Sequence, residues 1–314
     1  MINKIDKIEL KNYEREGKMK EERKKIKGII PPLLTSFDKN GDIYEKGQKE
    51  IIEFILPYID GVYPCGTYGS GPLMTINERK SVAELTISQI NGRVPVIMHV
   101  GAASTWETID LAKHAEEAGA DAVGAIAPYY YSYNDKELVN HYKRLIESVD
   151  IPVFLYNNPL TSGNSITPEV LNELAGEGLA GVKDSAFDLV NFYLYQIGVD
   201  NPNFKFIIGT EAIALGAFLS GAKAAICGVA NAIPEPLHKL WEFVQKKEWE
   251  EAQKVQMIVL KIRKIMKMGS TLTNCYAILK MRGIDAGQPR QPYLPVSDDH
   301  YDKLERGLKK LDVI

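Results

Sequence analysis

Cysteine and long apolar runs are scarce in this sequence. Its three cysteines, Cys65, Cys227 and Cys275, are scattered over 314 residues, which is too few and too far apart for a disulfide framework or a zinc site. No apolar run approaches the roughly 18–20 residues needed to cross a bilayer. We therefore expect a cytoplasmic protein with reduced cysteines, no bound metal and no membrane partner.

Neither sign of charge is in large excess. The 38 basic and 41 acidic residues give a net charge of −3, so the chain lacks the basic face with which proteins neutralise nucleic-acid phosphates. No apolar run leads into the glycine-rich fingerprint of a dinucleotide-binding fold. Apolar residues make up 45% of the chain and charged residues 25%, as is ordinary for a globular enzyme. We expect a small-molecule substrate and no nucleic-acid partner.

The first 27 residues differ from the rest of the chain. They hold ten Lys or Arg and six Asp or Glu residues, without the apolar segment of a secretory signal. We interpret residues 1–27 as a charged, solvated extension outside the fold. An alternative hypothesis is that translation starts at Met19, because Glu14–Gly17 is compatible with a purine-rich ribosome-binding sequence. The intact mass of the native protein would distinguish the two.

From Gly28 onward, short apolar runs alternate with longer amphipathic stretches. The runs are continuous, as expected for parallel strands covered on both faces, and lie at 28–34, 60–65, 94–100, 121–126, 152–157, 179–183, 204–209 and 222–228. The helical patterns between them include 76–90, 104–118, 135–148, 168–176 and 211–220. Eight strand–helix units predict an α/β fold, a (β/α)8 TIM barrel over residues 28–232.

The remaining residues, 233–314, exceed what one closing helix needs. Helical patterns at about 235–246, 248–268, 270–282 and 298–311 predict an additional C-terminal helical region packed on the barrel.

Active sites of such barrels lie at the C-terminal ends of the strands. Lys183 ends the apolar run Leu179–Val182, so its amine is expected at the barrel mouth. Burial there would lower the pKa of the lysine and favour a neutral amine that attacks a ketone to form an imine. The alternative is a strand-end lysine whose charged head extends into water.

Other strand ends carry hydroxyl and glycine residues. Tyr156 ends the strand next to that of Lys183, where it could transfer protons or be a core aromatic with a backbone partner. The segment Gly66–Gly71 is rich in glycine and hydroxyls, which suits a carboxylate or phosphate but also a plain tight turn. Residues 129–131 are three consecutive tyrosines, a pattern also typical of packing or subunit contacts.

Together these strand ends resemble the dihydrodipicolinate synthase / N-acetylneuraminate lyase family of class I pyruvate aldolases. The resemblance covers about residues 27–295. It rests on the order and spacing of Gly28–Phe37, Gly66–Gly69, His99–Gly101, Pro128–Tyr130, Tyr156–Pro159 with Gly163, and Gly181–Asp184.

The resemblance implies a role for each matching residue. Lys183 matches the lysine that forms the imine with pyruvate, and Tyr156 matches the tyrosine that moves protons to and from the substrate. Thr67 matches the first hydroxyl of the loop that holds the pyruvate carboxylate. Tyr130 matches a tyrosine that reaches across a subunit contact to complete the proton relay. Family members are usually homotetramers without metal or organic cofactor, so we expect the same here.

Departures from the family pattern bear on the substrate. Thr161 occupies the place where the synthases carry a carboxylate-binding arginine, which argues against lysine biosynthesis. Glu211 matches the first of two acidic residues that grip sugar hydroxyls in the sialate lyases, but Ala212 replaces the second. Tyr68 replaces the second hydroxyl of the loop, an aromatic similar to that of hydratase-aldolases. The Gly-Ser-Gly-Pro that follows resembles 2-keto-3-deoxygluconate aldolases.

We therefore predict a Schiff-base aldolase or lyase that reversibly cleaves a 2-keto acid, such as a 2-keto-3-deoxy sugar acid or a sialic-acid-like compound, to pyruvate and an aldehyde. The expected substrate-binding residues are Thr67, Tyr68, Thr161, Gly209, Glu211 and Gly228. The alternatives are a dihydrodipicolinate synthase, a Schiff-base hydratase or dehydratase, and a barrel that only binds a keto acid. Whether Cys65 or Cys227 contacts the substrate is left open.

Overall fold

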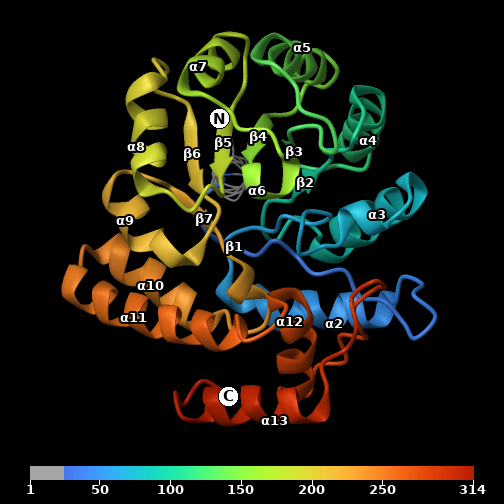
Figure 1. Ribbon diagram of the computed structural model, residues 1–314, viewed down its shortest axis with the longest axis vertical. Helices are drawn as coiled ribbons and strands as arrows, with labels where there is room; N and C mark the ends of the chain where they lie inside the picture. Colours follow the sequence, from blue (N-terminus) through green and yellow to red (C-terminus); the bar gives the residue numbers. More distant parts are fainter. Residues whose placement is uncertain (1–24) are drawn as a thin grey trace, which may run out of the picture.

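A computed structural model describes residues 25–314 (Figure 1). The alternative start at Met19 and all but the last three residues of the predicted extension lie outside the described residues. Seven parallel strands form one curled sheet in the order β1-β7-β6-β5-β4-β3-β2. The strands are β1 (Gly28–Ile30), β2 (Ile97–His99), β3 (Ala122–Ile126), β4 (Val153–Asn157), β5 (Gly181–Asp184), β6 (Lys205–Ile208) and β7 (Ala224–Ile226).

The second predicted strand, 60–65, is not a regular strand in the structure. It makes one parallel bridge, between Val62 and Val96. Its backbone nevertheless lies between β1 and β2: Asp60 N–H donates to Ile29 over 2.8 Å, and Val62 N–H donates to Pro95 over 3.0 Å. Prolines interrupt the ladder here, since residues 31, 32, 64 and 95 are all proline and cannot donate. The segment still closes the barrel expected from the sequence.

Helices surround the sheet, as Figure 1 shows. They are α2 (Glu45–Ile55), α3 (Ile76–Ile90), α4 (Thr105–Glu117), α5 (Asp135–Ile146), α6 (Pro159–Ser162), α7 (Pro168–Gly176), α8 (Leu189–Gly198) and α9 (Ala214–Leu219). The predicted helix at 211–220 is split, because a 3-10 turn (Glu211–Ile213) precedes α9. Thr167 caps α7 by accepting a hydrogen bond from Val170 N–H, as its sequence pattern predicts.

Four C-terminal helices lie to one side of the barrel (Figure 1). They are α10 (Glu235–Lys246), α11 (Trp249–Met266), α12 (Thr271–Met281) and α13 (Asp298–Lys309). The Tyr276 hydroxyl of α12 donates to the backbone carbonyl of Thr35 over 2.6 Å. The Ser36 hydroxyl donates to the backbone carbonyl of Ala286 over 2.8 Å. Thr35 and Ser36 follow β1 beyond its carboxyl end, so the C-terminal helices reach the face of the barrel where the predicted site lies.

Within residues 25–314, no helix combines the length and apolar character that a membrane span requires.

Candidate active site

Lys183 and Tyr156 are neighbours by strand register. β4 and β5 pair in parallel with Tyr156 opposite Lys183. The Lys183 amine lies 3.7 Å from the centroid of the Tyr156 ring and 4.3 Å from that of Tyr63. Only 3% of Lys183 is exposed. The lysine therefore does not extend into water, which was the alternative interpretation of its position in the sequence.

The surroundings of Lys183 favour its neutral form. Burial lowers the pKa of its amine, and the adjacent Tyr156 only partly opposes this effect. Among the described residues, no carboxylate lies within ion-pair distance of the amine. The pKa of nearby His99 also falls well below its ordinary value, through burial and through the charges of Arg79 and Lys183. A neutral amine is the form that can attack a carbonyl carbon.

The hydroxyl of Tyr156 belongs to a polar cluster. It lies 3.5 Å from the hydroxyl of Thr67 and accepts a hydrogen bond of 2.9 Å from the Asn158 amide. Burial by itself raises the pKa of Tyr156, but the neighbouring Lys183 and hydrogen bonds from polar side chains lower it overall. A tyrosine with a lowered pKa gives up its proton more readily than an ordinary tyrosine, which suits it to transfer protons.

A buried arginine supports the loop that carries Thr67. Arg79 of α3 donates to the carbonyls of His99 over 2.7 Å and Gly101 over 3.0 Å. His99 Nδ1 lies 3.0 Å from the carbonyl of Cys65, and its Nε2 lies 3.3 Å from the N–H of Ile126. Because a carbonyl only accepts and an N–H only donates, His99 is neutral with its proton on Nδ1. These contacts fix the backbone just before Thr67.

The loop itself is held in an unusual backbone shape. Cys65 and Ser70 both have positive φ, at 59° and 54°, although they are not glycine. A side chain on Gly71 would collide with the carbonyl of Cys65, so glycine is required for the chain to pass so closely. Such strain is typical of segments that a fold holds in place for function.

A cavity of about 230 Å³ lies over Lys183. Seven of the nine site residues expected from the sequence line it: Thr67, Tyr68, Tyr156, Lys183, Gly209, Glu211 and Gly228. Thr161 does not line this cavity and instead borders an adjoining one that also touches Thr67. Tyr130 lines neither cavity and is 87% exposed. The binding role of Thr161 stays a prediction, and so does the role of Tyr130 across a subunit contact.

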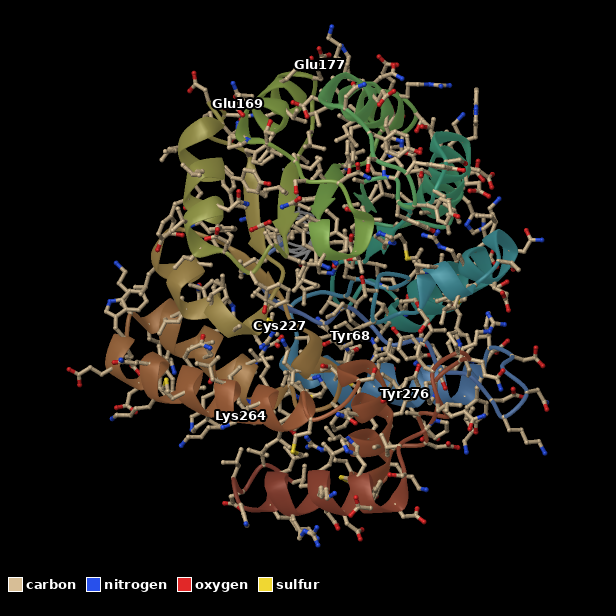
Figure 2. All side chains as sticks on the ribbon, viewed as in Figure 1. Tyr68, Glu169, Glu177, Cys227, Lys264 and Tyr276 are labelled. Carbon is tan, nitrogen blue, oxygen red and sulfur yellow. The ribbon has the colours of Figure 1, made fainter. Side chains whose placement is uncertain are left out.

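The two expected glycines give room to other side chains. A Cβ on Gly228 would overlap the ring of Tyr68, and one on Gly209 would overlap the hydroxyl of Ser185. Tyr68 lies in the interior near Cys227 (Figure 2). The glycines therefore shape the cavity by admitting Tyr68 and Ser185.

Glu211 is partly engaged by neighbouring side chains, and its Oε2 has no hydrogen-bond partner among the described residues. Its Oε1 receives a hydrogen bond of 2.8 Å from Arg263 Nε, and its backbone carbonyl receives one of 2.9 Å from Gln256. Both partners belong to α11. The C-terminal helical region thus contributes directly to the wall of the cavity.

Several residues that line the cavity were not expected from the sequence. They are Pro32, Asn158, Ser185, Phe187, Thr210, Ile226, Arg263, Lys267 and Thr271. Asn158 and Ser185 lie two residues beyond Tyr156 and Lys183, so their nearness to the strand ends was a usable signal. Arg263 and Lys267 come from a distant helix, and no local pattern marks them as site residues.

All three cysteines are buried and free. Burial raises the pKa of the Cys65 thiol to about 11 and that of Cys227 well above its ordinary value, so neither is a nucleophilic thiolate at neutral pH. Neither cysteine lines the cavity. Within residues 25–314, no group of three or more His, Cys, Asp or Glu residues is placed to hold a metal ion.

Comparison with known proteins matches residues 25–311 to the dihydrodipicolinate synthetase family. A DapA-like lyase of Halobacterium salinarum is 34% identical over 291 residues, covering 92% of this chain and 95% of that one. The Escherichia coli K12 protein YjhH, named "Probable 2-dehydro-3-deoxy-D-pentonate aldolase", is 36% identical over 218 residues, covering 68% of this chain and 72% of its own length.

Solved structures agree with the sequence comparison. The crystal structure of YagE from E. coli K12, solved in complex with pyruvate, superposes with a TM-score of 0.88 at 25% identity, covering 92% of this chain and 99% of that one. The match extends over the barrel and the C-terminal helices together. The chain therefore belongs to the dihydrodipicolinate synthetase family, whose members are pyruvate-dependent lyases.

Proposed function

We propose that this protein reversibly cleaves a 2-keto-3-deoxy acid to pyruvate and an aldehyde through an imine at Lys183. The buried amine of Lys183 carries the proposal, because it packs on the Tyr156 ring with no carboxylate partner among the described residues. Burial lowers the pKa of that amine and so favours its uncharged form. The imine it forms accepts electrons from the breaking carbon–carbon bond, so the chemistry requires neither a metal ion nor an organic cofactor.

The first half of the reaction builds the electron sink. The Lys183 nitrogen attacks C2 of the keto acid, and loss of water leaves a positively charged iminium. Hydroxyl groups of Tyr156 and Thr67, 3.5 Å apart, are available to pass the protons that this dehydration requires. The loop that carries Thr67 binds the substrate carboxylate next to C2.

The second half breaks the C3–C4 bond. Tyr156 takes the proton of the C4 hydroxyl, the C4–O bond becomes the aldehyde carbonyl, and the C3–C4 electron pair moves into the iminium to form an enamine. Protonation at C3 and hydrolysis then release pyruvate and restore Lys183. The lowered pKa of Tyr156 makes its phenolate accessible for this step.

Two observations favour a 2-keto-3-deoxy acid over the substrate of a dihydrodipicolinate synthase. Thr161 stands where the synthases carry their carboxylate-binding arginine. The name of the related YjhH describes an aldolase that acts on a 2-dehydro-3-deoxy acid. A 2-dehydro-3-deoxy acid belongs to the same class of compound as a 2-keto-3-deoxy acid. The aldehyde released would then be a short hydroxyaldehyde.

Trapping with borohydride tests the imine. Pyruvate followed by borohydride should attach a reduced three-carbon unit irreversibly to Lys183, as found by peptide mass spectrometry, and Lys183→Met should abolish it. Lactate, which has no ketone, is the matched control ligand. Absence of the adduct at saturating pyruvate would overturn the proposal. Release of pyruvate from a 2-keto-3-deoxy acid separates an aldolase from a dehydratase on the same scaffold, because the dehydratase keeps the carbon chain intact.

We further propose a homotetramer, in the cytoplasm, in which Tyr130 reaches a neighbouring subunit. The support is its exposure next to a second exposed ring: Tyr130 and Tyr131 pack edge to face with centroids 5.0 Å apart. Exposed aromatic pairs of this kind are characteristic of protein contact surfaces.

A further inference from the structure

The cavity over Lys183 has a buried end and an open end. Lys183 and Tyr156 form the buried end, with Lys183 3% exposed. At the open end lie Phe187, which is 46% exposed, and Lys267 at the end of α11. A substrate whose keto group reaches Lys183 therefore presents its remote end to Phe187 and Lys267.

Two cations flank the ring of Phe187. The Arg263 guanidinium carbon lies 5.4 Å from its centroid and the Lys267 amine lies 5.6 Å from it. Phe187 has a positive φ of 60°, a conformation that costs energy for an aromatic residue. The fold therefore holds this ring against both cations at the open end of the cavity.

The charges at this end do not cancel. Arg263 is paired with Glu211 at 2.8 Å, and the side chains are only 16% and 6% exposed. Lys267 has no carboxylate within ion-pair distance among residues 25–314. One acidic and two basic side chains thus leave a surplus of one positive charge on the lining of the open end.

Hydrogen-bond donors accompany the surplus charge. Of the Arg263 nitrogens, only Nε donates a hydrogen bond to Glu211. The two terminal nitrogens of the Arg263 guanidinium donate to no acceptor in the described part of the chain. Thr271, which also lines the cavity, is the first residue of the eleven-residue helix α12, so the positive end of that helix dipole lies at the same wall.

We propose that the open end of the cavity binds an anionic group, so that the substrate carries a second acid, a carboxylate or a phosphate ester, at the end remote from its keto group. The inference rests on the proposed function, since it takes the keto acid to be held at Lys183. A neutral polyol end would be a poorer match, because it would leave the surplus positive charge uncompensated. Glu211, the acceptor expected for sugar hydroxyls, has its Oε1 paired with Arg263 and only Oε2 without a partner.

Three substrates that differ only at C6 test the proposal: 2-keto-3-deoxygluconate with a neutral hydroxyl, its 6-phosphate, and 2-keto-3-deoxyglucarate with a carboxylate. At low ionic strength kcat/KM should be about tenfold or more higher for at least one of the two acidic substrates. Which one is preferred identifies the acid. Equal values for all three, or a preference for the neutral compound, would overturn the proposal.

Lys267→Met removes the unpaired charge while keeping the length of the side chain. It should reduce kcat/KM at least fivefold more for the preferred acidic substrate than for 2-keto-3-deoxygluconate. Lys264→Met is the matched control, because Lys264 lies on the same helix (Figure 2), is exposed and does not line the cavity. An equal loss on all three substrates would assign Lys267 to general packing and contradict the proposal.

Two readouts separate this inference from the proposed function. The borohydride adduct of pyruvate at Lys183 should persist in Lys267→Met, because the small keto acid does not reach the open end. If the adduct does not form in the unaltered protein, binding can still be measured by calorimetry. Titration of 2-keto-3-deoxyglucarate and of 2-keto-3-deoxygluconate 6-phosphate into the unaltered protein and into Lys267→Met still tests the charge at the open end. Unchanged affinity in Lys267→Met would then overturn the anion site alone.

Discussion

Residue identity at the ends of β4 and β5 determines the chemistry of this site. A lysine at a strand end is ambiguous in sequence, because its head can be buried or solvated. The register of the two strands removes the ambiguity, since Tyr156 pairs with Lys183 and covers its amine. The hydroxyl of Tyr156 then differs from that of nearby Tyr63, which has no hydrogen-bond partner.

That difference predicts unequal effects of removing the two hydroxyls. Tyr156→Phe should lower kcat for the cleavage of a 2-keto-3-deoxy acid by about 10²–10⁴-fold, the usual range for a positioned acid–base group. Tyr63→Phe keeps the ring against Lys183 and loses a hydroxyl without a partner, so its kcat should stay close to that of the unaltered protein. Steady-state kinetics measures both. Comparable losses in the two variants would contradict a proton-transfer role for Tyr156.

The burial of Asp184, the residue after Lys183, predicts a pH dependence of stability. Its side chain faces away from Lys183 toward the Asn157 amide, which donates to Oδ1 over 2.7 Å, while Oδ2 has no partner. Burial raises its pKa from 3.8 to about 6. Between about pH 4 and pH 6 the unfolded carboxyl ionises while the folded one keeps its proton, so this group's contribution to stability is lost as the pH rises through 6.

Asp184→Asn keeps the Oδ1 acceptor and cannot ionise. The free energy of unfolding of the variant, relative to the unaltered protein, should therefore rise by up to about 3 kcal/mol between pH 4 and pH 7. Urea unfolding at several pH values measures the difference. Asp302→Asn, at an exposed position of α13, is the control and should show no such trend. A flat difference for Asp184→Asn would mean that folding does not raise the pKa of this carboxyl.

At the scale of elements, periodicity and strand ends predicted most of the barrel. The strands β2 to β7 and the helices α3, α4, α5 and α7 lie where the apolar patterns indicate. The exception is the segment 60–65, where apolar character alone predicted a regular strand. Prolines at positions 31, 64 and 95 remove donors from this part of the ladder, so the segment closes the barrel with few regular pairs.

Sequence reasoning located several of the site residues that end or follow strands and missed all those that come from the C-terminal helices. Thr67, Tyr156 and Lys183 end or follow strands, and the barrel rule places such residues at one face. Arg263 lies on α11 and Lys267 directly follows it. The apolar pattern of α11 predicts a helix but does not indicate that the helix packs against the cavity. Only the packing of the C-terminal helices on the barrel reveals that Glu211 is neutralised by Arg263.

Tyr130 is the one predicted site residue that lines neither the cavity over Lys183 nor the adjoining one. Tyr130 is exposed and does not reach the cavity of its own chain, whereas the family resemblance gives it a role in a neighbouring subunit. If it acts there, Tyr130→Ala should lower turnover while the pyruvate adduct still forms at Lys183. Each site would then depend on two chains, which is a property that mixing can test.

Mixed oligomers of Lys183→Met and Tyr130→Ala chains should be more active than the mean of the two parents. Where a Lys183→Met chain and a Tyr130→Ala chain share this contact within the oligomer, the second chain keeps its lysine and receives Tyr130 from the first, so one of the pair's two sites is complete. Random pairing of equal amounts gives mixed dimers half of the time, and activity should return to about a quarter of that of the unaltered protein. The mixture is refolded or co-expressed and assayed beside each parent. Activity no higher than the mean of the two parents would place Tyr130 outside the catalytic relay, because a residue that acts only within its own chain cannot complement in this way.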